Sequence, residues 1–146
     1  LAVAVLGCSG GGAPKVDWTL EITGAVTQPL TLSYADLAKR ERVTLENIVM
    51  RRSQGEDTIN TWEGPSLAAI LEEAGASASA TAIVCTAADG YAMEIPMADL
   101  QDAIIALKQD GAWIADDEES GPIRIVVPNL PANSWIYQIT RIEVAE

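Results

Sequence analysis

The spacing of hydrophobic and polar residues changes several times along this chain, which predicts short strands joined by short helices. Apolar and polar residues alternate over residues 18–24, which predicts a half-buried strand, and the extended pattern resumes over 42–51. Apolar runs over 82–87 and 123–128 are typical of buried strands. The last predicted strand covers 134–144, where the apolar residues change face partway and so indicate a bulge.

Two stretches carry the polar and glycine residues that begin and end helices. Ser33 is a suitable N-cap for a helix over 34–39. A second helix is predicted over 67–74, opened by Pro65 or Ser66, because its apolar residues form one stripe. Gly75 follows as the residue that ends this helix.

A third helix and two hairpins complete the prediction of secondary structure. Apolar residues at helical spacing predict the third helix over 98–107. A polar turn at 53–57 connects the strand over 42–51 to a returning segment over 58–62. The Asp-Gly turn at 89–90 predicts a second hairpin with the preceding apolar strand.

The composition fits one acidic domain. The chain has 146 residues, enough to bury its own core, and residues 16–146 are predicted to form a single domain. Its 21 acidic and 9 basic residues give a net charge of −12, which repels phosphate backbones and argues against nucleic acid as a partner. The sequence contains no histidine, which excludes His-based triads and His-based zinc sites.

Residues 1–15 are predicted to be a signal-peptide remnant followed by a flexible tether. An apolar run leads through Gly7 and Cys8 into a Gly/Ser-rich segment, as in a bacterial lipobox. Under this interpretation Cys8 is the lipid anchor and the only membrane contact, and the protein is exported to the periplasm or the cell surface. The alternatives are a chance Gly-Cys pair or a free thiol. Cys85 lies in an apolar run and is predicted to be a buried, inert thiol rather than a disulfide partner of Cys8.

Five segments follow one another in a distinctive order along residues 18–146. They are VTLEN (43–47), TWEGPSLAAILEEAG (61–75), ADGYAMEIP (88–96), GPIRIVVPN (121–129) and WIYQITRIEV (135–144). In this order and spacing they resemble the molybdopterin-binding domain of the sulfite oxidase family. The resemblance implies an α+β fold of mixed β-sheets with short helices.

The resemblance also implies which residues face a cofactor. Catalytic relatives place a cysteine at the end of the strand that corresponds to 43–47, and its thiolate binds molybdenum. This chain has Asn47 there, and Tyr137 aligns with a lysine of many relatives. Asn47, Tyr137 and the cationic Arg51 and Arg124 are therefore the predicted cofactor-binding positions.

Further side chains extend this set. Tyr91 lies beside a turn, as Trp62 does, and the two could line a ligand groove or pack in the core. Arg52 and Arg141 are additional cations. Every arginine in the set has the alternative role of a solvated strand residue or a partner for carboxylates.

Other groups of acidic residues do not define a site. The acidic run over 116–119 could bind calcium or form a solvated turn. Carboxylate pairs for glycoside chemistry could come from Glu46, Glu63, Asp89 or Glu94, but the sequence does not indicate which of them face each other.

Two functions from different classes follow from the sequence. The first is an exported lipoprotein whose sulfite oxidase-like domain is non-catalytic and binds a small molecule or a protein partner. The second is a molybdopterin-dependent oxidoreductase with an atypical metal site. The resemblance implies molybdopterin as the cofactor, whereas Asn47 does not supply the expected thiolate. The first hypothesis predicts no catalytic and no metal-ligating residue.

Overall fold

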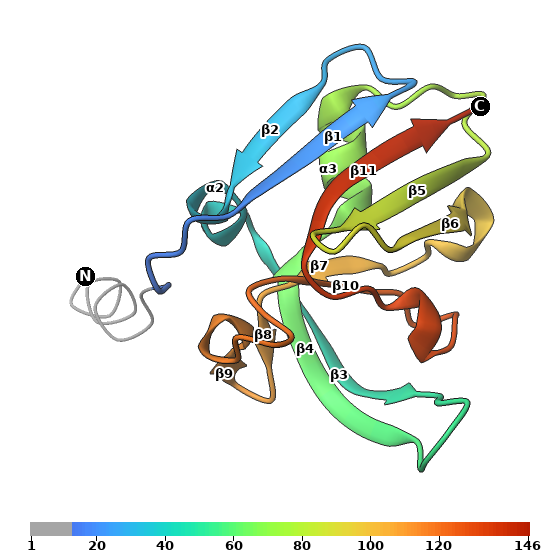
Figure 1. Ribbon diagram of the computed structural model, residues 1–146. Coiled ribbons are helices and arrows are strands. Elements are labelled where there is room, and N and C mark those ends of the chain that lie inside the picture. Colours follow the sequence, from blue (N-terminus) through green and yellow to red (C-terminus); the bar gives the residue numbers. More distant parts are fainter. Residues whose placement is uncertain (1–12) are drawn as a thin grey trace.

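The computed structural model describes residues 13–146, so the predictions for the first twelve residues, including Cys8, lie outside the described range. The largest sheet has five strands in the order β2-β1-β11-β5-β6. Its strands are β1 (Thr19–Gly24), β2 (Leu30–Ser33), β5 (Ala82–Ala87), β6 (Ala92–Pro96) and β11 (Ile139–Ala145). β1 and β11 run parallel although they come from opposite ends of the chain, and the other neighbours are antiparallel (Figure 1).

Two smaller sheets hold the middle of the chain. One has the order β3-β4-β8-β9 and consists of β3 (Arg42–Met50), β4 (Thr58–Pro65), β8 (Lys108–Gln109) and β9 (Ala112–Trp113). The other pairs β7 (Ile104–Ala106) with β10 (Arg124–Val126). In Figure 1 the hairpin of β3 and β4 extends away from the five-stranded sheet. Mixed sheets with few short helices confirm the predicted fold class.

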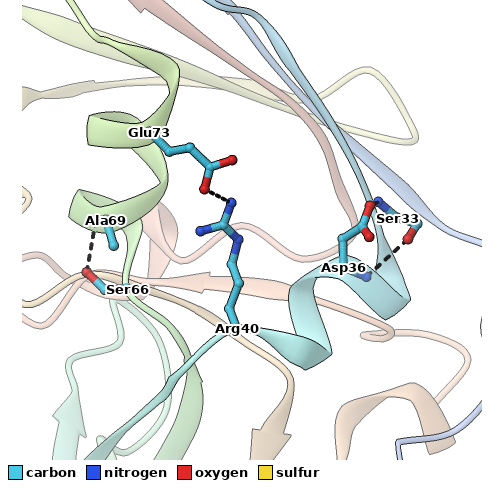
Figure 2. A network of polar contacts seen from close by, with 6 residues as sticks. All are labelled: Ser33, Asp36, Arg40, Ser66, Ala69 and Glu73. Carbon is cyan, nitrogen blue, oxygen red and sulfur yellow. Dashed lines mark hydrogen bonds and ion pairs between the residues drawn. The ribbon is translucent and has the colours of Figure 1, made fainter.

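The helix α2 (Tyr34–Lys39) begins where the sequence predicts it. The Ser33 side chain accepts a hydrogen bond from the Asp36 N–H, and the Asp36 carboxylate accepts one from the Ser33 N–H, as Figure 2 shows. This reciprocal capping box satisfies two backbone donors that a helix start leaves open.

The helix α3 (Leu67–Ala74) is also confirmed. The Ser66 hydroxyl accepts a hydrogen bond from the Ala69 N–H, and Gly75 ends the helix at φ 71°. A Cβ atom at Gly75 would collide with Thr27, so glycine is required there for space as well as for φ. Arg40 and Glu73 join the end of α2 to α3 through an ion pair of 2.6 Å (Figure 2).

The prediction of a third helix over 98–107 is wrong. Only the 3₁₀ turn Met97–Asp99 forms there, and β7 follows. All residues from Ala103 to Leu107 are buried, and β7 pairs with β10. A strand buried on both faces has a continuous apolar run, which periodicity alone does not distinguish from a buried helix.

The last strand is shorter than predicted. β11 begins at Ile139, because residues 132–134 form a 3₁₀ turn and 135–138 are irregular. The predicted bulge is confirmed, since the register with β5 shifts between Ile139 and Arg141. A further 3₁₀ turn is Ile114–Asp116. No helix among residues 13–146 is long and apolar enough to cross a membrane.

Candidate functional site

A cavity of about 750 Å³ opens where five separate parts of the chain meet. They are the end of β3 with the following loop, the turn between β5 and β6, the acidic turn at Glu119, β10 (Arg124–Val126) through Arg124, and the segment before β11. We call it the arginine cavity, because Arg51, Arg52 and Arg124 all line it. The sheets bring these segments together although they are far apart in the sequence.

Arg124 forms the buried side of the arginine cavity. It lies in β10, and only 6% of its surface is exposed. Its Nε–H donates to the Trp135 carbonyl oxygen at 2.8 Å, and its Nη2 lies 3.6 Å from the Met50 sulfur. Burial lowers the pKa of this guanidinium from its ordinary value. The role of solvated strand residue is therefore wrong for Arg124.

Aromatic rings surround this buried cation. The Arg124 guanidinium carbon lies 4.0 Å from the centre of the Tyr137 ring, 5.5 Å from that of Trp62 and 5.9 Å from that of Trp135. Trp62 and Trp135 meet edge to face with their centres 5.8 Å apart. Ring faces carry negative partial charge, so these rings offset part of the cost of burying the Arg124 cation.

The arginines of the cavity have no carboxylate partner among the described residues. The ion pairs found in residues 13–146 are Arg40 with Glu73 and Arg141 with Glu21. Arg51 donates to the Asn129 carbonyl oxygen, and Arg141 lies outside the cavity. In a chain with more than twice as many acidic as basic residues, this gathering of unpaired arginines is a local positive site.

Two tyrosines and two carboxylates line the cavity as well. Tyr91 and Tyr137 are 48% and 44% exposed, so their rings can contact a ligand. The Asp89 carboxylate accepts a hydrogen bond from the Tyr91 N–H, which fixes the turn between β5 and β6. The three arginines and the two carboxylates, Asp89 and Glu119, give the lining of the cavity a formal charge of +1.

Asn47 lies apart from the other predicted positions. Arg51, Tyr91, Arg124 and Tyr137 all line the arginine cavity, whereas Asn47 is not among its lining residues. Asn47 has φ 52° and occupies an irregularity in the register between β3 and β4. Its N–H donates to the Thr61 hydroxyl. Its cofactor role, like that of the other four, stays a prediction.

Sequence reasoning missed part of the cavity lining. The segment before β11 supplies Ala132, Asn133 and Gln138, and of these only Gln138 falls in the strand predicted over 134–144. Gln138 has φ 54°, and its side-chain amide donates to the Gly121 carbonyl oxygen at 3.0 Å. No sequence signal marks a glutamine for the left-handed region. The proline-rich run before residue 134 is the one hint that a strand does not start there.

The described residues do not fit a thiolate-bound molybdenum centre. Cys85 is the only cysteine in residues 13–146, and it is fully buried in β5, outside the cavity lining. Burial raises the pKa of its thiol to about 12, so no thiolate forms at neutral pH. Asn47 offers only a neutral amide. Within residues 13–146 there is also no group of three or more His, Cys, Asp or Glu side chains that could hold a metal ion.

The same residues do fit an anionic group. A buried cation with only neutral partners, together with two arginines at the rim of an open cavity, attracts negative charge. The chemistry that this arrangement supports is recognition of an anion rather than metal coordination.

Solved structures with a similar fold include a redox enzyme. The crystal structure of the sulfane dehydrogenase SoxCD from Paracoccus pantotrophus matches with a TM-score of 0.76 and 23% sequence identity, covering 92% of this chain and 40% of that one. At this level of identity the match shows the fold alone.

Curated relatives include two oxidoreductases. The uncharacterized oxidoreductase YuiH from Bacillus subtilis (strain 168) is 26% identical over 115 residues, which cover 77% of this chain and 58% of that protein. A nitrate reductase [NAD(P)H] from Hordeum vulgare is 28% identical over 171 residues, covering 92% of this chain and 19% of the relative. The chain thus spans less than two thirds of each of these relatives.

A family model, described as the oxidoreductase molybdopterin binding domain, matches residues 10–146. This range includes nearly the whole chain, all three sheets and every residue of the arginine cavity. The expected resemblance to sulfite oxidase-like proteins is confirmed, and the chain belongs to the oxidoreductase molybdopterin binding domain family.

Proposed function

We propose that this chain is a non-catalytic member of its family that binds a ligand in the arginine cavity. The observation that carries the proposal is a cavity lined by arginines that, within residues 13–146, have no carboxylate partner and no thiolate beside them to hold molybdenum. A cavity of about 750 Å³ lies in the range of small-molecule sites. The relatives have oxidoreductase names, but this chain spans only part of their length.

The proposal includes export and a lipid anchor at Cys8. Its support is the run from Val5 to Cys8, which resembles a lipobox, followed by a Gly/Ser-rich tether. The folded domain would then act at the periplasmic or outer surface of a membrane. Expression of the chain behind a complete signal peptide, with labelling by an alkyne fatty acid, should give a labelled protein. A labelled Cys8→Ser variant would refute the anchor.

The decisive experiment for the binding function is analysis of the purified protein from a host that makes molybdopterin. We expect no stoichiometric molybdenum by elemental analysis and no pterin fluorescence after oxidation. Molybdenum and pterin in one-to-one amount would instead support the alternative, an oxidoreductase with an atypical metal site. A family member with the metal-binding cysteine, prepared in the same host, is the positive control.

The Asn47→Cys variant sharpens this test. Asn47 does not line the arginine cavity, and residues 13–146 contain no group of three or more His, Cys, Asp or Glu side chains for a new thiol to complete. We therefore expect this single substitution to leave the protein without molybdenum in the same elemental analysis. Recovery of one-to-one molybdenum in the variant would contradict both this expectation and the proposed geometry.

A further inference from the structure

We propose that the ligand of the arginine cavity is a small planar carboxylate, an aromatic monocarboxylic acid, with Arg124 as its counter-charge and Tyr137 and Tyr91 as its stacking surfaces. This inference rests on the proposed ligand-binding function and deepens it. Three properties of the described residues support this ligand class. They are the burial of Arg124 without a carboxylate partner, the formal charge of the cavity lining and the exposed tyrosine rings.

The burial of Arg124 and its neutral hydrogen-bond partners favour a bound anion. The residue as a whole is more than nine-tenths buried and lines the cavity, yet the acceptors near its N–H groups among residues 13–146 include the Trp135 carbonyl and the Met50 sulfur, which are neutral. A buried charge without a counter-ion is costly, and the cation–π contacts offset only part of this cost. A bound anion would supply the missing partner.

The surroundings of the arginines favour a carboxylate over a phosphate. A guanidinium can pair with two oxygens of either group, so Arg124 alone does not distinguish them. Phosphate sites in proteins commonly use glycine-rich loops, helix N-termini or lysine. The lining of the arginine cavity contains no glycine, no lysine and no residue of α2 or α3.

The charge of the lining favours a single negative charge. Arg51, Arg52 and Arg124 against Asp89 and Glu119 give a formal +1. The domain around it is strongly acidic, so a dianion would meet more repulsion than a monoanion. A monocarboxylate matches the local charge.

The exposed rings favour a planar ligand body. Tyr137 stacks on the Arg124 guanidinium at 4.0 Å and still leaves 44% of its surface exposed, and Tyr91 is exposed to a similar extent. These are two of the four large hydrophobic side chains that are most exposed among residues 13–146, and both line the cavity. An aromatic ring next to them would gain offset or edge-to-face contacts.

The test is a titration of the metal-free protein with benzoate as the probe, followed by intrinsic tryptophan fluorescence, because Trp135 lines the cavity. Cyclohexanecarboxylate keeps the charge without the planar ring, benzyl alcohol keeps the ring without the charge, and sulfate is an anion without a ring. We expect saturable binding of benzoate, at least about tenfold tighter than that of each of the other three probes.

Variants of the chain locate the site. Arg52→Gln and Tyr137→Leu change exposed groups and should each weaken benzoate binding by about tenfold, as should Arg124→Met. Arg141→Gln is the matched control, because Arg141 pairs with Glu21 outside the cavity and should leave binding unchanged. Thermal melts check that each variant is folded. If Arg124→Met does not fold, the other two variants carry the test.

The outcomes separate this inference from the proposed function. Equal binding of cyclohexanecarboxylate, preference for sulfate, or no benzoate binding by a molybdenum-free protein would overturn the planar carboxylate and leave the non-catalytic function standing. Stoichiometric molybdenum in the purified protein would overturn the proposed function whatever benzoate does. Binding that Arg141→Gln weakens as much as Arg52→Gln does would also overturn the site.

Discussion

The backbone conformation at Asn47 favours asparagine at this position. Its φ of 52° lies in the left-handed region, which asparagine tolerates better than most residues, and the β3–β4 register breaks beside it. The sequence resemblance predicts that catalytic relatives have a metal-binding cysteine at this position. In this chain the local backbone geometry favours asparagine there.

This geometry gives a stability prediction at Asn47. Asn47→Gly should keep the free energy of unfolding within a few tenths of a kcal/mol, because glycine adopts positive φ freely. Asn47→Val should lower it by about 1–2 kcal/mol, since a β-branched residue is strained there. Urea unfolding followed by circular dichroism measures both values. A valine variant as stable as the glycine variant would show that the left-handed backbone is not required.

Tyr34 gives a prediction that depends on pH. Its ring is buried, and its hydroxyl has no hydrogen-bond partner among residues 13–146. Burial raises the pKa of Tyr34 from 10.0 to about 12. The unfolded phenol ionises first as pH rises, so the contribution of Tyr34 to stability is complete below pH 10 and is lost between pH 10 and about 12.

Tyr34→Phe tests both parts of this argument. At neutral pH the variant should be as stable as the parent or more stable by up to about 1 kcal/mol, because a buried unpaired hydroxyl is removed. Its loss of stability above pH 10 should be smaller than that of the parent. Urea unfolding at neutral and alkaline pH gives both differences. Tyr91→Phe, at an exposed position, is the control that should change neither.

Sequence reasoning selected residues that lie together but did not predict their burial. The fold brings Arg51, Tyr91, Arg124 and Tyr137 to one cavity, and their role in binding a cofactor stays a prediction. The burial of Arg124 was not predictable, because it depends on Trp62, far away in the sequence, and on the segment before β11. Local sequence carries no record of such packing.

At the scale of elements, the predictions held where short polar signals decide the structure. The cap of α2 and both ends of α3 lie where the sequence places them, because a helix start needs a specific side-chain acceptor within three residues. The helix prediction over 98–107 failed because residues 104–106 pair as a strand with β10, which lies further along the chain. Local signals therefore fix helix ends, while long-range pairing decides between strand and helix.

The capping box of α2 yields a prediction at this scale. Ser33→Ala should lower the free energy of unfolding by about 1 kcal/mol, because the Asp36 N–H loses its acceptor and the helix has only 6 residues. Chemical denaturation measures the change. Ser79→Ala, at an exposed position in a turn, is the matched control and should change stability by less than about 0.5 kcal/mol. An equal loss in both variants would mean that the cap contributes nothing specific.

For the molecule as a whole, we expect repulsion among the excess acidic side chains to outweigh the attraction within its ion pairs. The net charge of −12 is spread over a small domain, and the ion pairs found in residues 13–146 are only the two at Arg40 and Arg141. The gathering of three arginines at the cavity makes the remaining surface still more acidic. Self-repulsion of this kind destabilises the compact state.

Added salt should therefore stabilise this protein. Raising NaCl from about 20 mM to about 300 mM shortens the Debye length from roughly 20 Å to below 10 Å and screens repulsion across the surface. The two exposed ion pairs lose little, since such pairs contribute at most about 1 kcal/mol each. We expect the melting temperature, measured by scanning calorimetry, to rise with NaCl, and to rise less in a variant that carries Glu→Gln at exposed acidic positions such as Glu56 and Glu72. A melting temperature that falls with salt would show that attractive pairs, rather than the net charge, dominate the electrostatics of the folded chain.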